Sequence, residues 1–302
     1  MEYKTIKWSV HDNPRRAGEP CIGLLILNRP RHMNAVDPLM RLELDALCSE
    51  IARNSILKVV ILTGEGRGFC AGGDLPSEAE ALGVIEGAMG ITGPYKELAE
   101  TFFNDLRHRV LQSAMRRLED LPQVTIAAIN GAAVGVGLEM TILCDIRIAS
   151  EQARLGEVAV PAGFVPESGG ARNLPKLVGI GRAMRMILTG DIIDAKEALR
   201  IGLVDEVVAH EKLMEEAFSL AGRIAVNPYL SVRHAKKLIK MYWNWNRTEE
   251  GSREELESVL EITRTKDCQE GMRAFREKRQ PRYTYPYDAR WPFPESDPKK
   301  KD

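Results

Sequence analysis

The chain has 302 residues, enough for one large hydrophobic core and an additional helical region. Its 42 basic and 43 acidic residues leave a net charge near zero, so bulk electrostatics do not indicate a protein that binds nucleic acid or a membrane. Five cysteines without metal-ligand spacing are typical of reduced thiols in a cytosolic enzyme. Neither a signal-peptide core nor a run of roughly 18 apolar residues occurs, so we expect a cytoplasmic protein.

Short runs rich in Val, Ile and Leu alternate with helical patterns, which predicts an α/β fold with largely parallel strands. The expected strands are residues 5–10, 21–28, 58–63, 124–130, 145–149 and 205–208. Asp37 is a good N-cap and Pro38 suits the first helical position, so a helix should run from there to about Arg53. After about residue 210 the pattern becomes purely helical, with helices expected at 211–226, 229–243, 253–263 and 267–279.

Two segments have an unusual composition. Between Asp74 and Pro122 the chain carries a glycine-containing stretch at 83–93 and a helix-like stretch at 95–120. The end of the chain, residues 281–302, is dense in proline and aromatic residues, and proline at this density excludes a helix. We expect an extended arm that lies on a surface, because aromatic residues at this frequency pack against something. A disordered tail is the alternative, and it fits residues 296–302 best.

Two glycine-rich segments each follow a short apolar run. The first is Gly-Arg-Gly-Phe-Cys-Ala-Gly-Gly-Asp at 66–74, and the second is Asn-Gly-Ala-Ala-Val-Gly-Val-Gly-Leu-Glu at 130–139. Each is expected to enter a helix, whose first N–H groups are unpaired and carry a partial positive charge. Two such turns can aim one N–H each at a single oxygen that gains negative charge during a reaction. This arrangement suits a polarised carbonyl better than a phosphate.

Other glycine motifs fit less well. A dinucleotide-binding fingerprint needs a third glycine, which Gly135-Val136-Gly137 lacks. A phosphate-binding P-loop needs Gly-Lys-Ser/Thr, which does not follow Gly72-Gly73. The remaining alternative is that both segments are only tight turns. It is less favoured because the pattern occurs twice and its second copy ends in a glutamate.

At these residues the sequence resembles the crotonase (enoyl-CoA hydratase/isomerase) superfamily. The similarity runs in the family's order from about residue 5 to residue 280 and is specific for the fold and for acyl-CoA thioester chemistry. It implies a spiral core of ββα units at 1–209, a helical region at 210–280 that covers the acyl pocket and builds trimer contacts, and a separate tail at 281–302. The matching motifs are Leu27-Asn28-Arg29-Pro30, Phe69-Cys70-Ala71-Gly72-Gly73-Asp74-Leu75, residues 127–139, Cys144-Asp145-Ile146-Arg147-Ile148-Ala149 and Glu270-Gly271-Met272-Arg273-Ala274-Phe275.

The resemblance implies an oxyanion hole made by the backbone N–H groups of Gly73 and Val136. These donors would stabilise the thioester oxygen as it becomes enolate-like. The resemblance also makes Glu139 a catalytic acid–base group, and a single acid in an apolar segment must in any case be satisfied or functional. The structural alternative for Glu139 is a favourable position near a helix N-terminus.

The second glutamate of the family's hydratases is absent here, because Ala159 stands at its position. Glu167 stands where some enoyl-CoA and dienoyl-CoA isomerases place a catalytic carboxylate, so we expect it to act with Glu139. An acid at the N-terminus of a helix is the alternative for Glu167. Glu157 lies two positions before Ala159, on the same face if this piece is extended. We expect it to be solvated or paired across a strand, and the alternative is that it replaces the missing glutamate. The sequence therefore predicts that Glu167→Ala impairs turnover far more than Glu157→Ala.

By the same resemblance the substrate is a CoA thioester, and no separate cofactor is needed. The positions expected to contact CoA are Arg29, Ala35, Ala71, Asp74, Phe275 and Lys278, the last two in a neighbouring subunit of a homotrimer or dimer of trimers. Asp74 is also expected to brace its turn. Lys58 is a further basic candidate for the CoA phosphates. The five histidines are scattered and predict no metal site.

The favoured function is an enoyl-CoA hydratase that acts on a bulky acyl group. A bulky acyl group is expected because the segment after Asp74 is longer than in typical hydratases of the family. This segment would line the acyl end of the pocket. The alternative is that it is only a surface insertion. Three other functions stay open: an enoyl-CoA isomerase that uses Glu167, a C–C hydrolase of a cyclic keto-acyl-CoA, and a non-catalytic acyl-CoA-binding subunit.

Overall fold

The computed structural model describes residues 3–74, 112–244, 248–263 and 265–283. The stretch 83–93, most of the stretch 95–120 and all but the first three residues of the tail 281–302 therefore lie outside the described residues. Within the described part, no helix is both long enough and apolar enough to cross a membrane.

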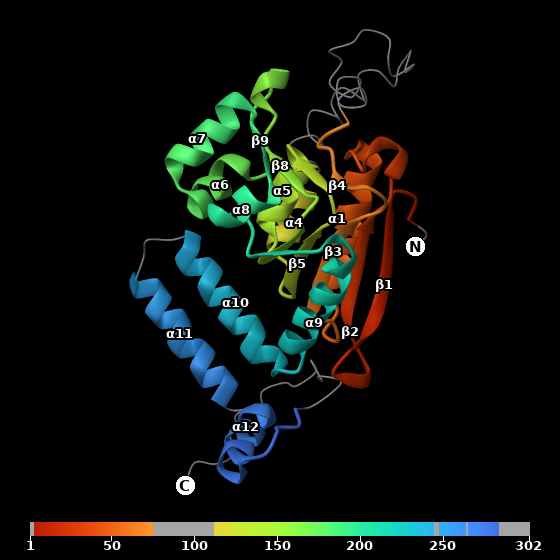
Figure 1. Cartoon of the computed structure of the whole chain (residues 1–302). Coiled ribbons are helices and arrows are strands. Elements are labelled where there is room, and N and C mark those ends of the chain that lie inside the picture. The colour runs from red at the N-terminus through yellow and green to blue at the C-terminus, as the bar shows by residue number, and fades with distance from the viewer. Residues whose placement is uncertain (1–2, 75–111, 245–247, 264, 284–302) are drawn as a thin grey trace, which may run out of the picture.

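A six-stranded sheet forms the centre of the molecule, in the order β1-β2-β3-β5-β7-β10 (Figure 1). β1 and β2 form an antiparallel hairpin, and all other neighbours pair in parallel. The strands are β1 (Ile6–Asn13), β2 (Arg16–Leu27), β3 (Val59–Gly64), β5 (Val124–Ile129), β7 (Ile146–Ser150) and β10 (Glu206–Val208). The six predicted strands and the largely parallel pairing are confirmed.

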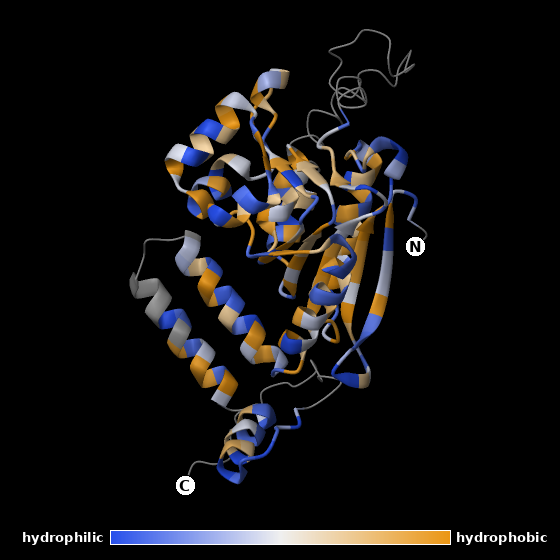
Figure 2. Cartoon of the chain, in the orientation of Figure 1, coloured by the Kyte–Doolittle hydropathy of each residue, from blue (hydrophilic) through white to orange (hydrophobic). Residues whose placement is uncertain are grey.

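The central strands of this sheet are buried on both faces. β3 and β5 are buried along their whole length, and Figure 2 shows the sheet as largely apolar. Side chains alternate between the faces, so Val60 and Leu62 enter one core while Val59 and Ile61 enter the other. Helix α9 (Leu213–Ala225) covers the second core and packs on β2, β3, β5 and β7. A sheet covered on both faces explains the continuous apolar runs of the sequence.

A second sheet of four short strands packs against the first core, and the sequence does not predict it. Its order is β4-β6-β8-β9, with β4 (Gly68–Cys70), β6 (Ala132–Val134), β8 (Arg154–Gly156) and β9 (Ile192–Asp194). Three residues are too few for an alternating pattern to be recognised. β4, β6 and β8 run parallel, so their carboxyl ends meet at one edge of the sheet.

Helix α1 (Pro38–Arg53) begins as predicted, because the Asp37 side chain accepts a hydrogen bond from the Met40 N–H at 2.8 Å. The C-terminal helices α9, α10 (Tyr229–Asn244), α11 (Thr248–Thr263) and α12 (Lys266–Glu277) also follow the prediction, and α11 and α12 extend away from the core (Figure 1). The remaining helices are α4 (Gln112–Glu119), α5 (Val136–Leu143), α6 (Gly170–Val178), α7 (Ile180–Thr189), α8 (Ala195–Arg200) and the 3₁₀ turns η1 (Pro30–His32), η3 (Val160–Ala162) and η4 (His210–Lys212).

Helix α5 is buried on all sides and lies directly against β4. A Cβ atom on Gly137 would lie 2.2 Å from the carbonyl oxygen of Cys70, so only glycine allows this approach. Gly135, which precedes the helix, has φ 52° and ψ −126°, a conformation that L-residues rarely adopt. These two glycines fix the N-terminus of α5 beside the end of β4.

We expect Gly137→Ala to lower the free energy of unfolding by about 3 kcal/mol, because the added methyl group meets backbone that cannot move aside. Gly181→Ala is the matched control, since Gly181 lies in α7 with open space around its Cβ position. The control should be neutral or stabilising by up to about 1 kcal/mol. Urea denaturation measures both, and equal stabilities would show that α5 is not held against β4.

Candidate functional site

The carboxyl ends of β4, β6 and β8 form the candidate site. Past the last paired residues of β6 and β8, the Gly135 N–H donates to the Gly156 carbonyl at 2.9 Å. The segments 71–74, 135–136 and 157–159 therefore come together, in the place where α/β sheets commonly bind ligands. A cavity of about 90 Å³ lies there, and its lining includes Ala71, Gly73, Val136, Glu139, Glu157 and Glu167.

Two backbone N–H groups are available at this cavity. Val36 pairs with the first glycine turn through the Gly72 carbonyl and the Asp74 N–H, so the Gly73 N–H between them points away from Val36. Val136 is the first residue of α5, and its N–H has no partner within the helix. Among the described residues, neither N–H donates a hydrogen bond to another protein group.

The two turns are also close to each other. A Cβ atom on Gly72 would lie 4.0 Å from the Val136 nitrogen. The predicted geometry of two turns that converge is therefore present. Each glycine run follows its predicted strand, β3 or β5, and contains a short strand, β4 or β6, that the sequence did not predict. The helix expected after the first turn lies outside the described residues.

Glu139 is buried in the first turn of α5 and is held by the loop before α6. Its Oε1 accepts hydrogen bonds from the N–H groups of Ser168, at 3.1 Å, and Gly170, at 2.7 Å. Burial raises the pKa of Glu139 to about 7, against the lowering effect of these two bonds and of Arg41. A carboxyl group with a pKa near neutrality exists in both protonation states at physiological pH, which suits acid–base chemistry.

Glu167 lies at the same cavity in an ion pair. Its Oε1 is 3.2 Å from Nη2 of Arg41, and its side chain is 43% exposed. It precedes the first residue of α6 by three positions, outside the helix. Its position at the cavity agrees with the predicted site, and its catalytic role stays a prediction.

Arg41 is a site residue that the sequence reasoning missed. It is fully buried in α1 and contributes to the electrostatics of both Glu139 and Glu167. A signal was present, because Arg41 shares the apolar face of α1 with Leu44, Cys48 and Ile51 at helical spacing. A charged residue at a core-facing position is rarely there without a partner or a function.

The prediction that Glu157 is solvated or paired across a strand is wrong. Its side chain is 1% exposed and borders the cavity. The strand β8 ends at Gly156, and the backbone of Ala159 is already helical at the start of η3, so the chain turns and carries the Glu157 side chain inward. Burial, and next to it the charge of Glu139, raise the pKa of Glu157 to about 7.

Arg29 and Asp74 connect the first glycine turn to α1. Nη2 of Arg29 lies 2.9 Å from Oδ2 of Asp74, and its Nε lies 3.2 Å from Oδ2 of Asp37. Arg29 also donates to the Ala35 carbonyl. The bracing role expected for Asp74 is confirmed, whereas contacts of Arg29, Ala35, Ala71 and Asp74 with CoA stay predictions.

Lys58 is not available to a phosphate. It is buried, and its Nζ donates to the carbonyl of Ala225 at 2.8 Å. Its suggested role at CoA is therefore wrong, because the ammonium group joins the start of β3 to the end of α9. Cys70 is buried and burial raises its thiol pKa to about 12, which agrees with a packing role.

Phe275 and Lys278 lie at α12, which is at the far end of the molecule from α5 (Figure 1). Phe275 is 86% exposed. A contact of either residue with CoA would need the pocket of a neighbouring subunit, and it stays a prediction. Within residues 3–74, 112–244, 248–263 and 265–283, no group of three or more His, Cys, Asp or Glu side chains could hold a metal ion.

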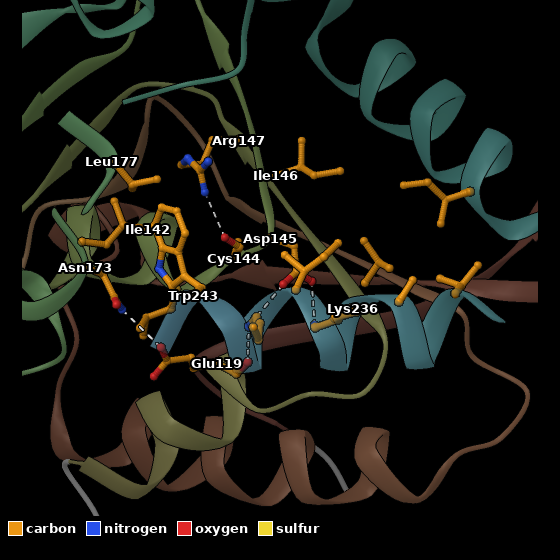
Figure 3. Close-up of a pocket in the computed structure, with 17 residues that line it drawn as sticks. Glu119, Ile142, Cys144, Asp145, Ile146, Arg147, Asn173, Leu177, Lys236 and Trp243 are labelled. Atoms are coloured by element: carbon orange, nitrogen blue, oxygen red, sulfur yellow. Dashed lines mark hydrogen bonds and ion pairs between the residues drawn. The ribbon is translucent and has the colours of Figure 1, made fainter. Parts of the chain in front are cut away.

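A larger cavity, of about 580 Å³, lies at the other end of α5, between the main sheet and α10 (Figure 3). Lys236 and Lys240 of α10 lie 2.6 and 3.2 Å from the two carboxylate oxygens of Asp145 and hold the helix there. Trp243, Ile142 and Leu177 contribute an apolar wall. None of the predicted site residues lines this cavity, so it is separate from the candidate site.

Comparison with known proteins places the chain in a family. Residues 18–286 match the enoyl-CoA hydratase/isomerase family. A short-chain-enoyl-CoA hydratase of Clostridium acetobutylicum is 37% identical over 260 residues, which cover 85% of this chain and 92% of the relative. A crotonyl-CoA hydratase of Syntrophomonas wolfei is 33% identical over 270 residues, which cover 86% of this chain and 94% of the relative.

Solved structures agree with the sequence comparison. An enoyl-CoA hydratase from Bacillus anthracis superposes with a TM-score of 0.77 at 35% identity, covering 93% of this chain and 99% of that one. DspI of Pseudomonas aeruginosa superposes with a TM-score of 0.79 at 31% identity, covering 94% and 98%. The matches in sequence and in fold confirm the resemblance predicted from the motifs. The chain belongs to the enoyl-CoA hydratase/isomerase (crotonase) family.

Proposed function

We propose that this protein stabilises the enolate of an acyl-CoA thioester and adds water to a 2-enoyl-CoA. One observation carries the proposal: the Gly73 and Val136 N–H groups are available at the cavity that also holds the buried carboxyl group of Glu139. Hydration needs these elements together, namely donors for the developing oxyanion and a group that moves protons near neutral pH.

The chemistry follows from the charges that develop on the substrate. The two N–H groups hold the thioester oxygen and draw electron density from C3 of the conjugated double bond. In a site closed to bulk water, each donor lowers the barrier by about 3 kcal/mol. Glu139, when ionised, takes a proton from a water molecule that attacks C3. A second acid must then protonate C2.

The names of relatives support hydration among the reactions of the family. Two relatives above 30% identity are a short-chain-enoyl-CoA hydratase and a crotonyl-CoA hydratase. An enoyl-CoA isomerase is the second candidate, because Glu167 borders the same cavity and is held by Arg41. An isomerase moves a proton along the acyl chain and adds no water.

We further propose a homotrimer or a dimer of trimers in which α10 to α12 contact neighbouring subunits. The extension of α11 and α12 away from the core supports this arrangement (Figure 1). No cofactor beyond the CoA thioester is proposed, since the enolate is stabilised by N–H groups of the protein itself.

Incubation with a panel of enoyl-CoA thioesters, followed by mass spectrometry of the products, tests the proposal. A hydratase yields products heavier by one water, whereas an isomerase yields products of unchanged mass and altered double-bond position. Cyclic keto-acyl-CoA thioesters belong in the same panel, because their cleavage would indicate the C–C hydrolase. Tight binding without any product would indicate the non-catalytic subunit.

We expect Glu139→Gln to lower kcat by roughly 10²–10⁴-fold with little change in the affinity for CoA esters, the scale of a lost acid–base group. Steady-state kinetics and calorimetric titration with a saturated acyl-CoA measure the two quantities. Near-wild-type turnover would remove Glu139 from the mechanism.

A bulky, branched or ring-bearing enoyl-CoA is expected to exceed crotonyl-CoA in kcat/KM. The reason is the long segment after Asp74, which lies outside the described residues. A competition assay with both substrates in one vessel gives the ratio directly. Fastest turnover of the four-carbon substrate would contradict the expectation.

A further inference from the structure

The Glu157 carboxyl group is buried at the site without the hydrogen bonds that would satisfy a carboxylate. Its Oε1 accepts one long bond, 3.3 Å, from the Ala159 N–H. Its Oε2 is inaccessible to solvent and has no hydrogen-bond partner among the described residues. A buried charge in this state is costly, so such a group either takes up a proton or meets a ligand.

The backbone places Glu157 next to the oxyanion turn. The pairing of Val134 with Gly156, and the Gly135-to-Gly156 hydrogen bond, put the residues that follow β6 beside those that follow β8. Val136 follows β6 and Glu157 follows β8, and both residues border the cavity. The Glu157 carboxyl group therefore borders the same cavity as one of the two donors that would hold the thioester oxygen.

Glu139 and Glu157 differ in how well they tolerate a negative charge. Glu139 accepts two N–H bonds and feels the positive charge of Arg41, while Glu157 accepts one weak bond and feels the negative charge of Glu139. Two neighbouring buried carboxyl groups cannot both ionise at low cost, so the pair retains one proton. That proton belongs on Glu157.

We infer that Glu157 is the second acid of the site and protonates C2 of the substrate, in place of the carboxylate that Ala159 lacks. This inference rests on the proposed function. The ionised Glu139 takes a proton from water as the oxygen–C3 bond forms. The electron pair of the double bond moves through the enolate to C2, which receives the proton of Glu157. The pair holds one proton before and after, and one water has been added.

The inference reverses the ranking of Glu167 over Glu157 that the sequence favours. Glu167 is half exposed and its Oε1 is paired with the guanidinium group of Arg41, whereas Glu157 is buried and has no cationic partner at either oxygen among the described residues. The role of Glu167 here is to position Arg41, which faces Glu139 from α1. The two assignments differ in which substitution abolishes chemistry at C2.

Hydrogen exchange at C2 of butyryl-CoA in D₂O isolates this step, because a saturated thioester cannot add water. The C2–H bond breaks when the single proton of the pair lies on Glu139 and Glu157 is ionised. The proton passes from C2 to Glu157, the carboxyl group exchanges it with D₂O, and a deuteron returns to C2. We expect Glu157→Gln to slow exchange by at least about 100-fold. Glu157→Asp should recover part of the rate, Glu167→Gln should lose less, and the surface control Glu151→Gln should match the wild type.

Exchange in Glu157→Gln at the wild-type rate, with loss in Glu167→Gln, would overturn the inference and restore the ranking favoured by sequence. A wild-type protein that exchanges C2 hydrogens but hydrates no enoyl-CoA would refute the proposed hydratase and leave the assignment of Glu157 standing. Absence of exchange in the wild type would overturn both.

Thermal unfolding provides a readout that does not depend on turnover. Between its ordinary pKa near 4.5 and its raised pKa near 7, Glu157 keeps in the folded chain a proton that the unfolded chain has released. Stability is therefore lost as the pH rises through this window. Because a glutamine has no proton to lose, Glu157→Gln should raise Tm relative to the wild type by roughly 2–6 °C at pH 8 and by much less at pH 5. Glu167→Gln, which only breaks an ion pair, should give no such gain, and a pH-independent effect of Glu157→Gln would contradict the retained proton.

Discussion

The contact between the N-terminal turn of α5 and the Cys70 carbonyl is the constraint on which the site depends. It exists because position 137 has no side chain, and it brings the first free N–H of a buried helix beside the turn that follows β4. The parallel ladder then aligns β8 with β6, so the third segment arrives at the same edge. A single close approach of backbone thus assembles groups separated by more than 80 residues of sequence.

Burial, together with the charges around the cavity, explains why the pKa values of Glu139 and Glu157 are raised to about 7. Three carboxyl groups, Glu139, Glu157 and Glu167, share the space with the buried guanidinium group of Arg41. Arg41 and the two loop N–H groups lower the cost of a charge on Glu139, but burial outweighs them. Glu157 has less compensation and a negative neighbour. Burial of these carboxyl groups lowers the stability of the folded chain. Such a loss is common at sites where activity requires groups that stability alone would not favour.

The fold and the first half of the site could be predicted from sequence. Long apolar runs revealed the main sheet, and the Asp37 cap revealed α1. Two glycine motifs located the turns whose Gly73 and Val136 N–H groups are available at the cavity. The second sheet could not be predicted, because strands of three residues carry no periodicity. Glu157 was misjudged because the turn after β8, which leads into η3 and carries its side chain inward, could not be recognised from the sequence. Arg41 could have been found from the sequence by noting that its charged side chain falls on the apolar face of α1.

The displacement of an acid from position 159 to position 157 has a stereochemical consequence. An enolate is planar, so an acid in a fixed position reaches C2 from one face of it. A proton delivered from the end of β8 reaches only that face of C2. C2 of an unbranched product carries two hydrogens, so the face becomes visible when water is replaced by D₂O. With Glu157 as the acid, the configuration of the deuterated C2 then follows from the backbone turn after Gly156.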